Sequence, residues 1–426
     1  MKGHSIATTA LVVTASLAAA ACGGGSSSGS SSGTPSILIG LNVPTTADPY
    51  VAGIITRGAQ LAVDQENAAG GVKVGGATYT LSIKKYDDGN NPQQAASNVD
   101  TAIHDGAVAL IEAGTGASIS ASHSASAGVP EIIVTNGDTS LLVNKQTNAP
   151  LPSLFRLGIP NDAASTLLST YIKSHTSSVA ILHDDTSNGR DGATTLESAL
   201  GTAGVSVSPA PIEVPSASPA IDAQVQQVKA ANPSGIVLWG TDLFIAKAVS
   251  AFRAAGVTAT IYTSKEGASP AVRLLAGNAA TEGIRLVTGR MTSEGDDTSF
   301  PNFEKQLAQD HLGPTDAGFK NAEGQEIRQP NDVDFFAYDS VKLIVAALQK
   351  DASVNPSQAL LKQMAVVMVK SANGDARGFD PMVHEAFAAQ DVYIAGIHDM
   401  QYEPVKDEML SATLPAEDEI LADFHA

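Results

Sequence analysis

The amino-acid sequence predicts an α/β protein with two lobes, each an open, mostly parallel sheet flanked by helices. From residue 36 onward, short apolar runs alternate with amphipathic helical patterns, as expected for βαβ units. The alternation stops near residue 156 and then starts again. The chain has 426 residues, which are too many for one ordinary hydrophobic core. A second sheet with its own helices explains both the length and the restart.

The composition narrows the classes of partner. Hydrophobic residues make up 43% of the chain and charged residues 16%, which is typical of a folded α/β protein. The 25 Lys and Arg residues and the 44 Asp and Glu residues give a formal net charge of −19. Nucleic acid and anionic lipid headgroups are repelled by such an excess of negative charge, so neither is an expected partner.

Residues 1–35 predict a secretion signal, a lipid anchor and a tether. Lys2 precedes an apolar stretch at residues 6–21 that is too short to span a bilayer comfortably, and Cys22 follows at once. Residues 1–21 therefore have the pattern of a signal peptide. They resemble a bacterial lipoprotein signal, although Ala19 stands where Leu is usual. The resemblance implies that Cys22 becomes the lipidated first residue of the mature chain; an ordinary secretory signal followed by a chance cysteine is the alternative. Residues 22–35 then form a tether, of which 23–33 are only Gly and Ser.

The elements of the two series follow from hydrophobic periodicity and from Gly, Pro and capping residues at their ends. The first series predicts strands at 36–43, 79–88, 107–113 and 131–135, and helices at 52–67, 93–104 and 118–127. The second predicts helices at 162–175, 192–203, 220–231 and 243–255, and strands at 178–184, 205–214, 235–240 and 260–263. Later residues predict strands at 283–288 and 391–400, helices at 335–348 and 356–369, and a polar surface loop at 313–331. An acidic tail occupies residues 413–426.

Patterns for catalysis or metal binding are weak. His183, Asp184 and Asp185 are adjacent in a strand, so their side chains alternate in direction and cannot all reach one ion. The sequence contains no G-x-S-x-G motif, and the glycines at 114–116 have neither a G-x-G-x-x-G pattern nor a Walker lysine. We therefore expect no enzymatic activity, no metal and no cofactor.

Several ordered motifs after residue 36 resemble the branched-chain-amino-acid type of periplasmic solute-binding protein, which has the type I two-lobed fold. The motifs are Gly58-Ala59-Gln60-Leu61-Ala62-Val63 with Asn67-Ala68-Ala69-Gly70-Gly71, Tyr86-Asp87-Asp88-Gly89-Asn90-Asn91-Pro92, Gly128-Val129-Pro130, Ala180-Ile181-Leu182-His183-Asp184-Asp185, Thr281-Glu282-Gly283 and Tyr338-Asp339-Ser340-Val341. Each motif is short, and their order and spacing carry the resemblance over nearly all of the chain after the tether.

The resemblance implies a mechanism. Three crossovers, near residues 156, 283 and 355, would hinge an N-terminal lobe (36–156 and 284–355) and a C-terminal lobe (157–283 and 356–412). A small molecule would bind between the lobes and favour the closed form through the additional contacts made there. The partners implied are a small-molecule ligand and a membrane ABC permease, and the protein is expected to be a monomer anchored outside the cytoplasm to the cell membrane. The alternative function is a sensor that presents ligand state to a signalling partner.

The family's binding positions fall on loops after the strands, where open parallel sheets bind ligands. In the first lobe, Thr115, Gly116, Ala117 and Ser118 begin a helix, so their backbone N–H groups suit a carboxylate; a tight turn without ligand is the alternative. The next loop supplies Asn136, Gly137 and Asp138, although Asp138 replaces the usual Thr and is equally natural as a helix cap. Tyr50 is the candidate aromatic wall.

In the second lobe the resemblance points to Glu266 as the partner of a ligand ammonium group, with a solvated charge as the alternative. Asn188 and Thr241 stand where aromatic residues are common in the family, and Trp239 is expected to pack at the end of its strand. Fewer aromatic residues, together with carboxylates at Asp138 and Asp242, predict a polar cleft. The expected ligand is therefore a polar or cationic amine-bearing solute, or a small amide, rather than an aliphatic amino acid.

Overall fold

The computed structural model describes residues 34–218, 220–289, 298–309, 329–387 and 391–405. Within these residues the chain forms two lobes, each with a mostly parallel sheet flanked by helices, as predicted. No described helix is long and apolar enough to cross a bilayer. The signal peptide, Cys22, the polar loop at 313–328 and the tail at 413–426 lie outside the described residues.

The first lobe is built on a six-stranded sheet in the order β2-β3-β1-β4-β5-β6. Every neighbouring pair is parallel except β2 with β3. Its elements are β1 (Ser36–Val43), α1 (Pro49–Ala68), β2 (Val72–Val74), β3 (Ala77–Asp87), α2 (Pro92–His104), β4 (Ala107–Glu112), α3 (Ala117–Ala127), β5 (Glu131–Ile133) and β6 (Leu154–Arg156), joined later by α11 (Asp332–Asp351), α12 (Gln358–Met364) and the hairpin β13 (Met368–Lys370) and β14 (Ala376–Gly378).

The second lobe is built on an eight-stranded sheet in which β7, β10, β11 and β12 run parallel. Strand β15 pairs antiparallel with β12 on one side and with β16 on the other. Its elements are α4 (Asn161–His175), β7 (Ser178–Asp184), α5 (Ser187–Ala203), β8 (Ser206–Val207), β9 (Ile212–Val214), α6 (Asp222–Ala231), β10 (Gly235–Trp239), α7 (Asp242–Ala254), β11 (Thr260–Thr263), the 3₁₀ helix η1 (Lys265–Ala268), α8 (Pro270–Ala276), α9 (Asn278–Thr281), β12 (Arg285–Gly289), β15 (Val392–His398) and β16 (Gln401–Pro404).

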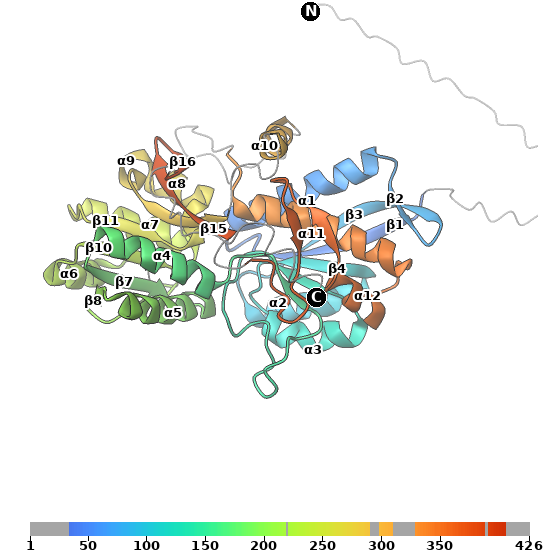
Figure 1. Ribbon diagram of the computed structural model, residues 1–426, viewed down its shortest axis with the longest axis horizontal. Coiled ribbons are helices and arrows are strands. Elements are labelled where there is room, and N and C mark those ends of the chain that lie inside the picture. Colours follow the sequence, from blue (N-terminus) through green and yellow to red (C-terminus); the bar gives the residue numbers. More distant parts are fainter. Residues whose placement is uncertain (1–33, 219, 290–297, 310–328, 388–390, 406–426) are drawn as a thin grey trace, which may run out of the picture. The chain divides into compact units, whose positions relative to one another are not determined.

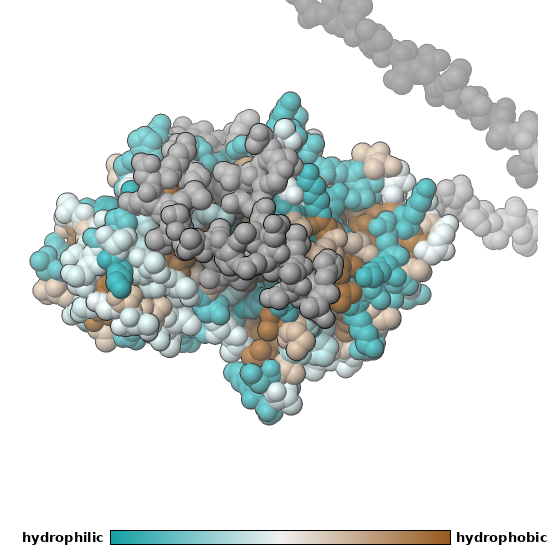
Figure 2. All heavy atoms as spheres, viewed as in Figure 1, coloured by the Kyte–Doolittle hydropathy of each residue, from teal (hydrophilic) through white to brown (hydrophobic). Residues whose placement is uncertain are grey.

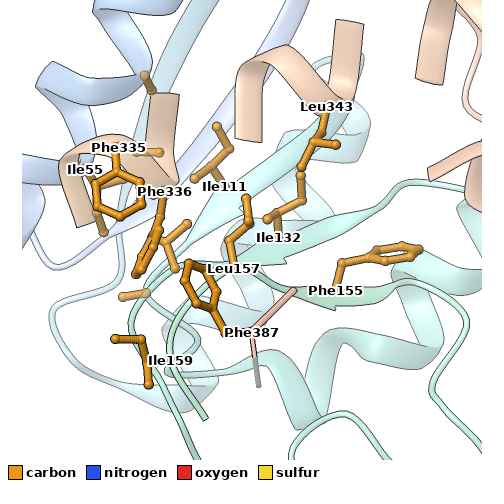
Figure 3. Close-up of a cluster of buried hydrophobic side chains, with 14 of the residues drawn as sticks. Ile55, Ile111, Ile132, Phe155, Leu157, Ile159, Phe335, Phe336, Leu343 and Phe387 are labelled. Atoms are coloured by element: carbon orange, nitrogen blue, oxygen red, sulfur yellow. The ribbon is translucent and has the colours of Figure 1, made fainter. Parts of the chain in front are cut away.

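Helix α11 fixes the core of the first lobe, because it returns to pack against α1 (Figure 1). Phe335 and Phe336 of α11 are fully buried beside Ile55 of α1, and burial of each ring stabilises the fold by about 2–3 kcal/mol (Figure 3). At the crossing a Cβ on Gly58 would overlap the carbonyl oxygen of Asp334, so the two helices approach closely only because residue 58 is glycine.

On the face drawn in Figure 2, hydrophilic and intermediate residues cover most of the described surface, and hydrophobic residues form small patches.

The crossings between the lobes differ from two of the expected positions. Strand β12 pairs with β11, so the chain leaves the second sheet after Gly289 and not near residue 283. Helix α12 lies against the first lobe, where the N–H of Ser357 donates to the carbonyl of Gly128 at 3.1 Å, so no crossing occurs near residue 355. The chain returns to the second sheet with β15.

Two expected elements are also corrected. The strand expected at 205–214 is two short strands, β8 and β9. The helix expected at 356–369 ends at Met364, and β13 follows. The prediction also missed short elements, among them helices α8 and α10 (Ser299–Gln309).

Candidate functional site

A cavity of about 800 Å³ lies between the two lobes. Its walls come from loops at the carboxyl ends of parallel strands in both sheets, where open α/β sheets place their ligands. The predicted ligand-binding residues that line it are Thr115, Ser118, Asn136, Asn188, Thr241 and Glu266. Those that do not line it are Tyr50, Gly116, Ala117, Gly137 and Asp138. The volume suits a small organic molecule.

The start of helix α3 forms the first-lobe wall. Gly114 has a φ of 93°, and Gly116, which precedes the first helical residue, packs so tightly that a Cβ would lie 2.6 Å from the carbonyl oxygen of Pro92. This tight turn places Thr115 and Ser118 on the cavity. The first N–H groups of a helix have no partner inside the helix, and its dipole favours an anion there. Ala117 is fully buried and does not line the cavity.

The loop after β5 is held by hydrogen bonds of its own side chains. The amide of Asn136 donates to the Gly114 carbonyl at 3.2 Å, and its Oδ1 accepts the N–H of Asp138 at 3.0 Å. Oδ1 of Asp138 accepts both the N–H and the hydroxyl of Ser140 at 2.9 Å. Asp138 therefore stabilises a turn and does not line the cavity.

Asn188 and Gly137 join the two lobes beside the cavity. The N–H of Gly137 donates to Oδ1 of Asn188 at 2.9 Å, and the Asn188 amide donates to Oε1 of Glu266 at 3.1 Å. A second contact lies nearby, where the N–H and hydroxyl of Thr139 donate to Asp191 at 3.0 and 2.7 Å. Asn188 thus replaces an aromatic wall with a polar link between loops of both lobes.

Glu266 presents a carboxylate oxygen to the cavity wall. Nζ of Lys265 lies 2.9 Å from its Oε1, whereas Oε2 is buried and accepts no hydrogen bond from any described residue. The side chain of Glu266 is 12% exposed. A buried carboxylate oxygen without a donor is costly, so Oε2 is suited to accept an N–H or O–H group from a bound molecule.

Thr241, Trp239 and Tyr50 have different roles. The hydroxyl of Thr241 accepts the N–H of Phe244 at 3.3 Å and so caps α7 at the edge of the cavity. Trp239 is fully buried at the end of β10 and packs against Gly192, as expected. Tyr50 is half-buried outside the cavity lining, and its pKa is raised by burial and by the negative charges of Asp242 and Asp48.

The sequence analysis missed several charged residues in the cavity wall, among them Asp48, Lys265 and Asp332. Asp48 caps α1, where its Oδ1 accepts the N–H of Val51 at 3.1 Å. Asp332 begins α11 and accepts the hydroxyl of Thr288 and the N–H of Gly289; burial raises its pKa to about 6. The available signal was their position, because each lies at or beside the start of a helix.

Comparisons with known proteins agree with the two-lobed fold. A family model described as periplasmic binding protein matches residues 36–400. No curated protein sequence matches. A periplasmic binding protein type 1 from Bordetella pertussis Tohama I superposes with a TM-score of 0.72 at 19% identity, over 88% of this chain and 100% of that one.

Two further structures were solved with ligands. The branched-chain amino acid transporter substrate binding protein LivJ from Streptococcus pneumoniae, in complex with isoleucine, has a TM-score of 0.71 at 18% identity, over 86% of this chain and 98% of that one. The solute binding protein of an ABC transporter from R. palustris, in complex with benzoate, has a TM-score of 0.71 at 16% identity, over 87% of this chain and 95% of that one. At these identities the likeness shows the fold.

Proposed function

Because this chain belongs to the periplasmic binding protein family, which binds solutes and is not enzymatic, we propose that it captures a small polar solute between its lobes for delivery to an ABC permease. The observation that carries the proposal is the cavity of about 800 Å³, which has an anion-binding helix start on one wall and Glu266 on the other. The ABC transporter proteins with similar folds support the transport role.

The two walls suggest the chemistry of the solute. A carboxylate of the solute binds the first-turn N–H groups of α3 beside Thr115 and Ser118. A donor on the same solute, an amine, amide or hydroxyl, binds Oε2 of Glu266. Asp48, Asp242 and Asp332 add carboxylates to the lining, which favours a polar or amine-bearing solute over an aliphatic one.

The solute itself is the first measurement. Mass spectrometry of small molecules released from the purified protein identifies what copurifies, and calorimetry then tests a panel of polar and basic amino acids, amides, isoleucine and benzoate. Tight binding of isoleucine without a response to the polar members would overturn the polar preference. No binding of any carboxylate-bearing compound, and none copurified, would overturn solute capture by this site.

One variant separates the two walls. Glu266→Gln replaces a charged acceptor by a neutral one, and a charge-assisted hydrogen bond is worth about 1.5–3 kcal/mol, so affinity for an amine-bearing solute falls by about tenfold or more. Glu197→Gln, an exposed glutamate on α5 outside the cavity, is the matched control and leaves the affinity unchanged. Equal affinities for all three proteins would remove Glu266 from the site.

We further propose that Cys22 is lipidated after cleavage of residues 1–21 and that residues 22–35 tether the monomeric folded body to the membrane surface. More than one acyl chain gives durable attachment, and the Gly/Ser tether leaves the lobes free to open and close.

A further inference from the structure

Two buried carboxyl groups from opposite lobes meet at the cavity. Asp48 caps α1 in the first lobe, and Asp242 is the first residue of α7 in the second. Both line the cavity, and they are only 2% and 1% exposed. Their side chains lie within hydrogen-bonding reach of each other, and the charge of Asp48 acts directly on the carboxyl group of Asp242.

The other hydrogen bonds of the pair come from neutral donors within each lobe. Oδ1 of Asp48 accepts the N–H of Val51, and Oδ1 of Asp242 accepts the N–H of Leu243 at 2.8 Å. Oδ2 of Asp242 accepts the hydroxyl of Ser269. These bonds do not depend on how the lobes are arranged. The contact between the two carboxyl groups does depend on the arrangement of the lobes, because it exists only when the lobes are together.

The cations near the pair are engaged with other groups. Nζ of Lys265 lies against Glu266, and its charge also lowers the pKa of Asp332. Nζ of Lys247, on α7, donates to the carbonyl of Ser218 at 2.7 Å. Tyr50, on α1, carries a phenol whose pKa is raised by burial and by the charges of Asp242 and Asp48, so it is neutral.

Two carboxylates at hydrogen-bonding distance cannot both remain charged in a buried site, so they must share a proton. Burial and Asp48 together hold the pKa of Asp242 well above its usual range. When the lobes separate, Asp242 meets water and loses the burial that raises its pKa, so its carboxyl group gives up the proton more readily.

We propose that closure of the lobes takes up one proton, held between the carboxyl groups of Asp48 and Asp242, so that the closed form is favoured as the pH falls. The inference rests on the proposed closing of the lobes around a solute. Because closure binds one proton, the ratio of closed to open molecules falls by up to tenfold for each unit that the pH rises, within the range between the pKa of the open form and that of the closed form. A solute captured in acidic surroundings would then be held more firmly than in neutral ones.

Small-angle X-ray scattering of the mature chain, free of solute, measures the closure between pH 5 and pH 9. We expect the radius of gyration of the wild-type protein to increase with pH. In Asp242→Asn the amide donates to the Asp48 carboxylate without titrating, so the protein stays closed and the profile is flat. Asp48→Asn reverses the roles and gives the same flat profile, while its side chain still caps α1.

Asp339→Asn is the matched control. Asp339 is fully buried in the first lobe, accepts the hydroxyl of Ser371 and the N–H of Ala372, and has a pKa raised by burial to about 6. Asp339 titrates, but its partners lie within the first lobe, so Asp339→Asn keeps the wild-type scattering profile. Thermal unfolding verifies that all three variants fold.

A wild-type profile without pH dependence, or pH dependence retained in both Asn variants of the pair, would overturn the inference. An opposite trend, with closure favoured as the pH rises, would also overturn it, because a cationic group between two charged carboxylates gives that sign. Calorimetry with the identified solute keeps the two proposals apart. Normal capture with no pH-dependent closure rejects the proton alone, and pH-dependent closure without capture rejects only the proposed function.

Discussion

Arg156 offers the most direct test of how the cavity is held in shape. It ends β6 and is 1% exposed. One of its terminal nitrogens, Nη1, donates to the carbonyls of Asn136 at 3.2 Å and Asp138 at 2.7 Å. Its other nitrogens pair with Glu385, in the segment that leads to β15. A single guanidinium therefore fixes a loop of the cavity wall to a crossing between the lobes.

The perturbation is Arg156→Met, which keeps an unbranched apolar stem and removes every side-chain donor. Loss of one partner of a buried ion pair costs about 3–5 kcal/mol. The side chain of Glu385 is 19% exposed and can be partly hydrated, which places the loss near the lower end, at about 3 kcal/mol. Glu385→Gln is the matched comparison, because it removes the partner's charge but keeps both carbonyl bonds and a neutral acceptor for the guanidinium, so it costs less than Arg156→Met.

Urea unfolding followed by the fluorescence of Trp239, the single tryptophan, measures these losses. Calorimetry with the identified solute measures the second effect, because a displaced Asn136 weakens binding by about tenfold in Arg156→Met and little in Glu385→Gln. The reasoning fails if Arg156→Met loses less than about 1 kcal/mol. It also fails if Glu385→Gln loses as much as Arg156→Met, since the carbonyl bonds would then carry no part of the stability.

Three further outcomes are expected. A methyl group on Gly192 overlaps the indole of Trp239, so Gly192→Ala lowers the free energy of unfolding by about 1–3 kcal/mol in urea, whereas Gly201→Ala, where a Cβ meets nothing within 4 Å, does not. The raised pKa of Asp339, about 6 in the folded protein, means that the unfolded chain binds fewer protons there; stability therefore falls as the pH rises from about 4 to about 6, and Asp339→Asn flattens this part of the profile. Cys22→Ser abolishes incorporation of labelled fatty acid and moves the protein from the membrane to the soluble fraction; unchanged labelling would contradict the anchor.

Hydrophobic periodicity predicted the elements that lie wholly inside a sheet. Strand β7 begins and ends at the predicted residues, because residues 179–182 at its centre are a continuous apolar run that is fully buried. The lobe boundaries were less predictable. Strand β12 has the same pattern in either sheet, and only its pairing with β11 assigns it to the second lobe. Helix α12 ends at Met364 and strand β13 begins at Met368, a change of structure that the local hydrophobic pattern does not reveal.

The site was predictable by position and not by contact. The loops after β4, β5 and β11 reach the cavity as expected, because each leaves its own sheet at the edge formed by the carboxyl ends of the parallel strands. Asp138 follows the correct strand, yet its carboxylate is taken by Ser140 two residues away. Asx turns of this kind satisfy a carboxylate locally, and a sequence alone does not show whether Asp turns inward or outward.

The carboxylates that do line the cavity share one structural origin. Asp48 caps α1, and Asp242 and Asp332 are the first residues of α7 and α11. Acidic residues are favoured at helix starts because they complement the helix dipole and accept free N–H groups. In a parallel sheet the helix that follows a strand begins at the strand's carboxyl end, which is also the edge of the cleft. Local helix stability therefore concentrates negative charge around the ligand site. Closure brings such Asp residues from both lobes together, so their negative charges must be compensated by a proton or a cation at the interface. In this chain we propose that a proton held by Asp48 and Asp242 does so.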